Sequence, residues 1–150
     1  MGAKAASQGF LTAEELLDGP AVLHPLPRSV LDWVSVIRQG ISAAAVDTLT
    51  REVRISRAEL AAALGIPERT LARRKQEGLL SSEESAKLVR LARVVQRAEE
   101  VFEDPDAAVD WLKSPNAAFS GETPLSLLDT EIGAELVMDT LGRIEHGVFA

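Results

Sequence analysis

The chain has 150 residues, enough for one domain or two small ones, and 46% of them are hydrophobic, which suffices for a modest core. It has no cysteine, which excludes disulfides and thiolate metal sites. No apolar run approaches the roughly 20 residues that a membrane-spanning helix needs, and the segment Met1–Phe10 lacks the apolar centre of a secretory signal. We therefore expect a cytoplasmic protein without a membrane partner.

The net charge of −7 is divided unevenly along the chain. Residues 1–53 carry a net −2, residues 54–97 a net +5 and residues 98–150 a net −10. A basic centre suits the neutralisation of nucleic-acid phosphates, and an acidic end suits the attraction of a basic protein. Charge runs are also common on plainly solvated surfaces, and both interpretations stay open at this point.

Helix signals appear in order from the N-terminal end. Thr12-Ala13-Glu14-Glu15 has the form of a capping box and predicts a short helix that Gly19-Pro20 ends. A second helix is predicted over Ser29–Gly40, from a capping serine to a terminating glycine, and a third over Ser42–Val53. The apolar residues of the second helix recur at helical spacing: Val30, Leu31, Trp33, Val34, Val36 and Ile37.

The basic centre predicts two short helices followed by a long one. The short helices span Arg57–Leu64 and Glu68–Glu77, and the tight turn Gly65-Ile66-Pro67 joins them. A capping box at Ser81–Glu84 opens the long helix, which runs to about Phe102. Its apolar stripe contains Leu88, Leu91, Val94, Val95, Ala98 and Val101 or Phe102.

The acidic end predicts three more helices. Caps followed by proline predict a helix over Pro105–Lys113 and a short one over Leu125–Leu128, and Thr130 caps a last helix over Glu131–Glu145. Gly133 inside that helix costs about 1 kcal/mol against alanine, which indicates the close approach of another helix or a partner. No segment alternates with period two, so we expect an all-α fold. The inward residues of the last helix are predicted as Ile132, Leu136, Val137, Thr140, Leu141 and Ile144.

The two short basic helices have the spacing of a helix-turn-helix. Ala61 falls where the helices cross closely, and Gly65 falls at the turn, where a left-handed backbone is needed. In this motif the second helix enters the major groove, where Arg reads guanine and Gln reads adenine. An ordinary helical hairpin with an Arg-rich surface is the alternative. The predicted DNA-binding residues are Arg57, Arg69, Thr70, Arg73, Arg74 and Gln76.

Residues 104–149 carry an ordered set of motifs that resembles the Xre/MbcA/ParS toxin-binding domain. Trp111 is expected in the core of this small domain, with an interface anchor as the alternative. A basic helix-turn-helix is the usual companion of this domain, so the resemblance covers residues 30–150. The matching motifs are Trp111-Leu112, Pro115-Asn116, Gly121, Pro124-Leu125, Thr130, Gly133 and Leu141-x-x-Ile144-x-x-Gly147.

The resemblance implies a type II antitoxin. It implies an arm and short helix over 1–28, a DNA-binding domain over 29–102 and a toxin-binding domain over 103–150. The implied partners are a RES-domain toxin that degrades NAD or transfers ADP-ribose, operator DNA in the chain's own promoter, and a second copy of the chain. Either the Trp33 helix or the long helix is expected to form the dimer surface. No cofactor is expected.

We hypothesise that the C-terminal tail enters and blocks the active site of such a toxin. NAD carries a dianionic pyrophosphate, so the toxin pocket that binds NAD should be basic. An aromatic residue beside a terminal carboxylate would suit such a pocket. A frayed terminus is the alternative. The predicted toxin-binding residues are Arg143, His146, Gly147, Val148, Phe149 and Ala150.

Other functions have weaker support in the sequence. Catalysis is not expected, because the two histidines stand far apart and no Gly-rich phosphate loop or metal-ligand cluster is present. A helix-turn-helix repressor with a dimerising C-terminal domain and no toxin is the main alternative. A third possibility is a helix-turn-helix that has lost DNA binding and only dimerises.

Overall fold

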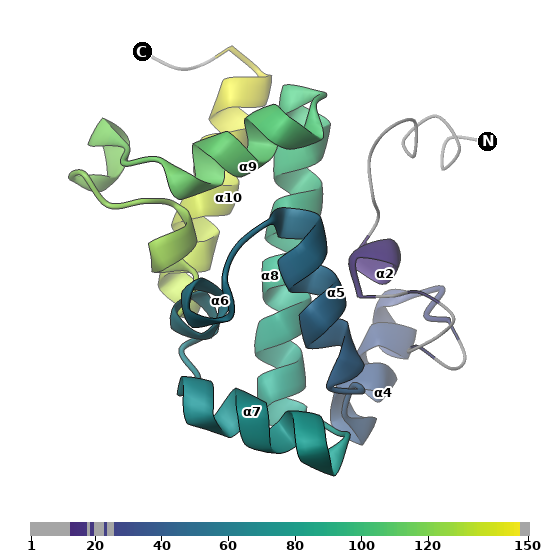
Figure 1. Ribbon diagram of the computed structural model, residues 1–150. Coiled ribbons are helices and arrows are strands. Elements are labelled where there is room, and N and C mark those ends of the chain that lie inside the picture. Colours follow the sequence, from purple (N-terminus) through teal and green to yellow (C-terminus); the bar gives the residue numbers. More distant parts are fainter. Residues whose placement is uncertain (1–12, 18, 20–22, 24–25, 148–150) are drawn as a thin grey trace.

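The helices are grouped around one long central helix (Figure 1). The computed structural model describes residues 13–17, 19, 23 and 26–147. The central helix, α8, spans Ser82–Phe102. On one side of it lie α2 (Ala13–Leu16), α4 (Val30–Gln39) and α5 (Ala44–Val53), and on the other lie α9 (Pro105–Lys113) and α10 (Glu131–Glu145).

The remaining elements complete an all-α fold, as the sequence predicts. α6 (Arg57–Leu64) leads into α7 (Glu68–Glu77), which lies across one end of the bundle in Figure 1. Two 3₁₀ turns, η1 (Ala117–Phe119) and η2 (Leu125–Leu127), connect α9 to α10. Within the described ranges there is no strand, and no helix is both long and apolar enough to cross a membrane.

Local capping explains where most of these helices begin. Each capping side chain accepts a hydrogen bond from a backbone N–H of the first turn, which would otherwise lack a partner. Ser56 and Ser81 form complete capping boxes with Glu59 and Glu84. Three other capping side chains accept from a single backbone N–H each: Ser29 from that of Asp32, Asp104 from that of Asp106, and Thr130 from that of Gly133.

Four local expectations need comment. The third helix begins after Ala43 rather than Ser42, although the Ser42 hydroxyl still accepts from the Ala44 N–H at 3.2 Å. The predicted helix over Leu125–Leu128 is a single 3₁₀ turn, because only three residues separate its proline from the next turn. No element is predicted over residues 117–119, where the structure has the 3₁₀ turn η1. The predicted cap Thr12 lies outside the described residues.

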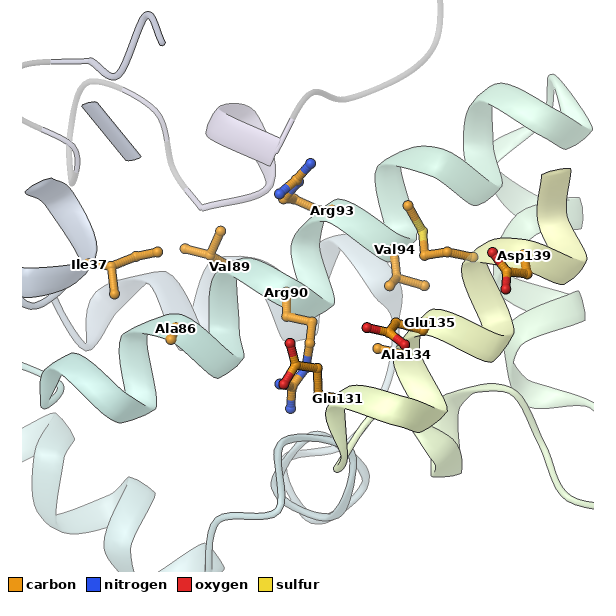
Figure 2. Close-up of a pocket in the computed structure, with 11 residues that line it drawn as sticks. Ile37, Ala86, Val89, Arg90, Arg93, Val94, Glu131, Ala134, Glu135 and Asp139 are labelled. Atoms are coloured by element: carbon orange, nitrogen blue, oxygen red, sulfur yellow. The ribbon is translucent and has the colours of Figure 1, made fainter. Parts of the chain in front are cut away.

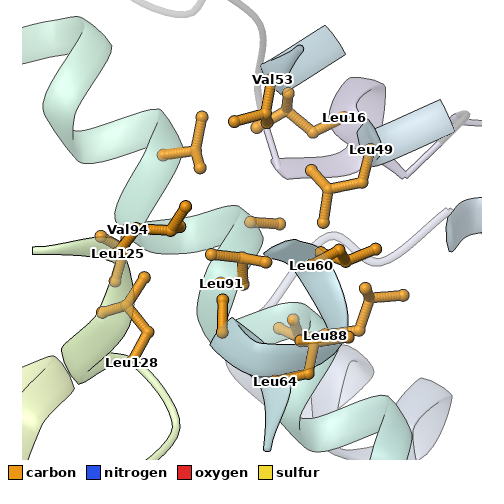
Figure 3. Close-up of a cluster of buried hydrophobic side chains, with 14 of the residues drawn as sticks. Leu16, Leu49, Val53, Leu60, Leu64, Leu88, Leu91, Val94, Leu125 and Leu128 are labelled. Carbon is orange, nitrogen blue, oxygen red and sulfur yellow. The ribbon is translucent and has the colours of Figure 1, made fainter. Parts of the chain in front are cut away.

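One hydrophobic core runs through the basic and acidic halves of the chain (Figure 3). Leu16 and Leu49 enter it from the N-terminal helices, Leu91 from α8, and Leu125 and Leu128 from the C-terminal segment. Full burial of a leucine stabilises a fold by about 1.5–3 kcal/mol. The boundary that the sequence placed between residues 102 and 103 therefore does not separate two cores, because α8 contributes to both sides.

Polar contacts also fasten the C-terminal segment to the rest. The Arg90 Nη2 donates to the Leu128 carbonyl at 3.1 Å, and the Lys113 Nζ donates to the Arg54 carbonyl at 3.0 Å. Arg97 on α8 forms a two-point ion pair with Glu145 near the end of α10. This pairing raises the pKa of the Arg97 guanidinium and lowers the pKa of the Glu145 carboxyl.

Candidate functional site

The turn between α6 and α7 has the geometry that the helix-turn-helix spacing predicts. Gly65 has φ +68° and ends α6 in the left-handed conformation, which favours glycine. Ala61 is buried at the helix crossing, and a Cβ on Gly65 would lie 3.3 Å from the Cβ of Asp129. The apolar contacts that fix the two helices come from buried side chains, namely Leu60, Leu64, Ile66 and Leu71.

α7 presents one exposed face that carries three of the predicted DNA-binding residues. Leu71 is the residue of α7 that is buried. Arg69, Arg73 and Gln76 are exposed and share a side of the helix, because they are spaced by four and three residues. Thr70 is half-buried at the edge of that face. A molecule that packs against this face would contact all three exposed side chains.

Other basic side chains near α7 lie against acids of the same chain. Arg57, at the start of α6, lies 3.4 Å from Asp47, and Lys75 lies 3.1 Å from the same carboxylate. Arg73 lies 3.7 Å from Glu77. These partners are all at least a third exposed, so each pair contributes little to stability and its cation can turn to a stronger anion.

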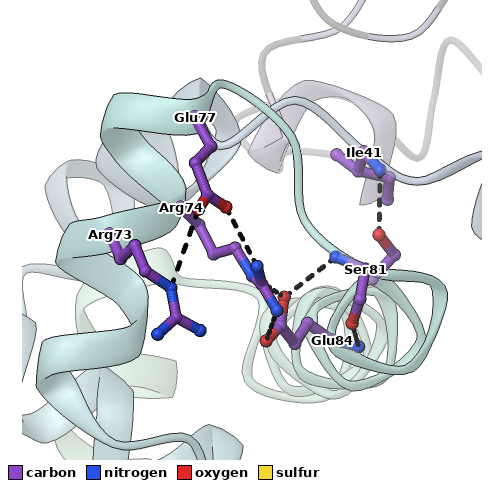
Figure 4. A network of polar contacts seen from close by, with 7 residues as sticks. Ile41, Arg73, Arg74, Glu77, Ser81 and Glu84 are labelled. Carbon is purple, nitrogen blue, oxygen red and sulfur yellow. Dashed lines mark hydrogen bonds and ion pairs between the residues drawn. The ribbon is translucent and has the colours of Figure 1, made fainter.

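Arg74 is held in a polar network that joins α7 to α8 (Figure 4). Its Nε donates to Glu84 Oε1 at 2.8 Å, its Nη2 to Glu84 Oε2 at 3.1 Å, and its Nη1 to Glu77 at 3.0 Å. Burial opposes ionisation of Glu84, but hydrogen bonds from Arg74 and Ser81 outweigh it and lower the pKa of the carboxyl. The hydrogen bonds to Glu84 and Glu77 raise the pKa of the Arg74 guanidinium. The sequence grouped Arg74 with the DNA-binding residues, and in the structure its half-buried side chain is paired with Glu84 and Glu77 of the same chain.

The acidic segment is fixed by an aromatic group and a close backbone contact. Trp111 is half-buried between Phe102, with ring centroids 5.6 Å apart, and Phe119, at 6.2 Å. A Cβ on Gly133 would lie 1.9 Å from the carbonyl oxygen of Leu127. The close approach that the sequence predicts at Gly133 is thus confirmed, and the neighbour is the 3₁₀ turn η2.

The predicted toxin-binding residues lie at the end of α10. Arg143 is exposed, and the side chain of His146 is 73% exposed one turn later. Gly147 has φ +70° and follows the helix. Val148, Phe149 and Ala150 lie outside the described residues. The arrangement gives α10 an exposed end from which the chain continues.

Two predictions about α10 are wrong. Ile132 and Leu136 were expected inside, but their exposed fractions are 79% and 43%. The buried positions Gly133, Val137 and Thr140 set the rotation of the helix, which turns the two apolar side chains outward. Helical spacing predicts which residues share a face, but here the tight contact at Gly133 decides which face is inside.

The sequence also missed an open groove between α4, α8 and α10 (Figure 2). Its volume is about 410 Å³. Val89 and Val94 of α8 and Met138 of α10 line its apolar part, and the charged side chains of Arg93 and Glu135 stand at its edge. No spacing in the sequence indicates this groove, because its walls are about 40 residues apart in the chain.

Comparison with known protein families divides the chain at the middle of α8. Residues 32–93 match the antitoxin Xre-like helix-turn-helix domain. Residues 97–147 match the antitoxin Xre/MbcA/ParS C-terminal toxin-binding domain. The two matches share α8, which agrees with the single core and with the contacts that α8 makes on both sides.

Several proteins similar to this chain are antitoxins or come from toxin-antitoxin complexes. "Antitoxin Xre" of Yersinia enterocolitica is 39% identical over 119 residues, which is 78% of this chain and 80% of that protein. The "Prs ADP-ribosylating antitoxin" of a Sphingobium strain is 27% identical over 132 residues, 81% of this chain and 83% of that protein. The fold also resembles a chain in the crystal structure of the M. tuberculosis MbcT-MbcA toxin-antitoxin complex, with a TM-score of 0.55, 22% identity, and coverage of 72% of this chain and 96% of that chain. This chain therefore belongs to the Xre family of antitoxins, the neutralising components of toxin-antitoxin systems.

Proposed function

We propose that this antitoxin binds and inhibits a RES-type toxin that consumes NAD, and that it represses its own operon as a homodimer on promoter DNA. The match of residues 97–147 to a toxin-binding domain carries the first part. The name of the Sphingobium relative connects an antitoxin with ADP-ribosylation, a reaction that draws on NAD. The M. tuberculosis neighbour comes from a complex of toxin and antitoxin, which supports inhibition by direct binding.

The end of α10 suits the role of an active-site plug. An enzyme that binds NAD must accommodate two phosphate charges, so its pocket carries basic groups that attract an acidic partner. Residues 98–150 supply a net charge of −10. Arg143 and His146 are exposed where the helix ends, and Phe149 follows within the tail. The flat ring of Phe149 matches a slot shaped for a nucleotide or nicotinamide ring.

Deletion of residues 148–150 tests this mechanism. The gene next to the antitoxin gene is expressed in bacteria together with either the full chain or the shortened one, and growth and cellular NAD are measured. The full chain should protect, and the shortened chain should lose most of the protection. An unchanged melting temperature of the shortened chain shows that it still folds. Equal protection by both chains overturns the plug, and absence of protection by the full chain overturns the proposed function.

The exposed face of α7 supports the DNA-binding part of the proposal. Arg69, Arg73 and Gln76 lie on it together, and the described part of the chain offers Arg69 no ion-pair partner. Insertion of this face into a major groove would bring them to base edges and phosphates. In this arrangement Arg74 holds α7 in place from behind, and Arg57 can exchange Asp47 for a phosphate.

For the proposed homodimer, the exposure of its apolar side chains favours α4 as the contact surface. None of the ten residues of α4, all of them described, is buried, although six are apolar. Val30 and Leu31 are 80% and 78% exposed. The long helix α8, the other candidate, buries ten of its residues within the fold and has little apolar surface to spare. Pairing of two α4 helices would cover these side chains and present two α7 helices to a two-fold DNA site.

A further inference from the structure

Ile132 and Leu136 form an apolar step on the outer side of α10, and we infer that this step docks into an apolar depression on the toxin whose edge carries Lys or Arg. The inference rests on the proposed function and adds a second contact to it, away from the tail. The step is made of the two side chains that the helical spacing assigns to the core and the fold turns outward.

The fold prevents these side chains from turning inward. Gly133 sits against the carbonyl of Leu127, and its N–H donates to the Thr130 hydroxyl at 2.9 Å. Ala134 and Val137 on the same side are also buried. Because successive helix positions turn by about 100°, the buried face that Gly133, Ala134 and Val137 share leaves Ile132, one position before Gly133, on the solvent side of the helix. The helix is thus locked with the apolar step exposed.

A pair of apolar side chains one turn apart differs from a single exposed leucine. Isolated apolar residues are ordinary on protein surfaces, whereas neighbouring ones mark contact sites. Ile132 and Leu136 are spaced by four residues and therefore stack on one face of the helix. Further along this face, seven residues after Leu136, stands the exposed Arg143, so the face continues toward the end of α10 from which the tail leaves.

The acidic side chains beside the apolar step indicate which kind of surface the step binds. Glu131, Glu135 and Asp139 lie along one edge of the step, all exposed, where they also line the groove that Arg90 and Arg93 of α8 share. None of the three acids has an ion-pair partner within 4 Å in the described ranges, so all three can face a cationic partner. Three carboxylates beside an apolar pair match a surface with an apolar centre and a cationic edge. A toxin whose substrate is the anion NAD has cationic residues around its pocket, and the same chain's tail is proposed to enter that pocket. A second antitoxin copy would bring the same acids together, which is unfavourable.

The test measures binding to the purified product of the neighbouring gene by calorimetry. The variant Ile132→Ser/Leu136→Ser should raise the Kd about tenfold to hundredfold, as truncation of central interface residues does. Leu26→Ser is the matched control, since Leu26 is 40% exposed and Leu136 43%, and its Kd should stay within twofold. The melting temperature should change little in both, because the substituted side chains are exposed.

Further variants separate the possible outcomes. Ile132→Ser alone, at the more exposed position, should give most of the loss of affinity. If the double variant unfolds, the Kd of this single variant tests the proposal. Glu135→Gln/Asp139→Asn should slow association at low salt and flatten its salt dependence. A Kd within twofold of the wild type for the serine variants overturns the docking step and leaves the proposed function standing. No binding by the wild-type chain overturns both.

Discussion

Glu84 at the start of α8 receives a two-point hydrogen bond from Arg74 of α7 and also caps its own helix through the Ser81 N–H, at 2.9 Å. One nearly buried carboxylate therefore sets the angle between the proposed DNA-reading helix and the central helix. The position of the exposed face of α7 depends on this pair, although neither residue lies on that face.

Substitution of Arg74 tests the structural role of the pair. Arg74→Ala leaves a nearly buried carboxylate without its main partner and should lower the free energy of unfolding by about 2–3 kcal/mol. Arg69→Ala, on the same helix but exposed, should change it by no more than about 0.5 kcal/mol. Urea denaturation followed by circular dichroism measures both. Similar small losses for the two variants would show that Arg74 does not anchor α7.

The stability contributed by Glu84 should depend on pH. Its pKa in the folded state lies below the ordinary value of 4.5, so the ionised form stabilises the fold. This contribution is complete above about pH 4.5–5 and is lost as the pH falls through the folded-state pKa. The difference in unfolding free energy between the wild type and Glu84→Gln should therefore shrink below pH 4.5. A difference that stays constant from pH 7 to pH 3 contradicts the prediction.

Two glycines of α10 should respond in opposite ways to alanine. Gly133→Ala forces a Cβ onto the Leu127 carbonyl and should cost more than about 2 kcal/mol. A Cβ on Gly142 meets nothing within 4 Å, so Gly142→Ala should stabilise the helix by up to about 1 kcal/mol. Thermal unfolding measures both. Stabilisation by Gly133→Ala would mean that η2 does not press on α10.

Binding to promoter DNA should depend on the exposed arginines of α7. Arg69→Ala and Arg73→Ala should each weaken binding about tenfold, and a phosphate contact should also reduce the salt slope by about one. Arg93→Ala removes another exposed cation, from α8 rather than α7, and should leave affinity nearly unchanged. Gel shifts in a salt series measure these effects. Equal affinities for all three variants would exclude α7 as the reading helix.

Self-association should depend on α4. Leu31→Glu places a charge in the proposed dimer contact and should raise the dimer dissociation constant about tenfold or more. Ile132→Glu is the matched control, because Ile132 is 79% exposed and Leu31 78%, and it should leave the dimer intact. Analytical ultracentrifugation without toxin or DNA measures both. Dissociation by Ile132→Glu instead would move the dimer surface to α10.

The sequence alone determined where most of the helices begin and end. Caps such as Ser56, Ser81 and Thr130 act on N–H groups within three residues, so their effect is visible in the printed order of residues. The left-handed turn at Gly65 is local in the same way. The family motifs of the acidic segment can be recognised from the sequence for the same reason, because they consist of turns and caps at fixed spacing.

The tertiary structure decided which helix faces are buried and which basic side chains form ion pairs with acids of the same chain. Ile132 is exposed because Gly133 meets the carbonyl of Leu127, and Arg74 is engaged in an ion pair because Glu84 faces it from another helix. Both outcomes depend on the distance between elements that approach only after the chain has folded. Side-chain spacing predicts a face, but the direction of that face is fixed by packing between elements, which a local pattern does not contain.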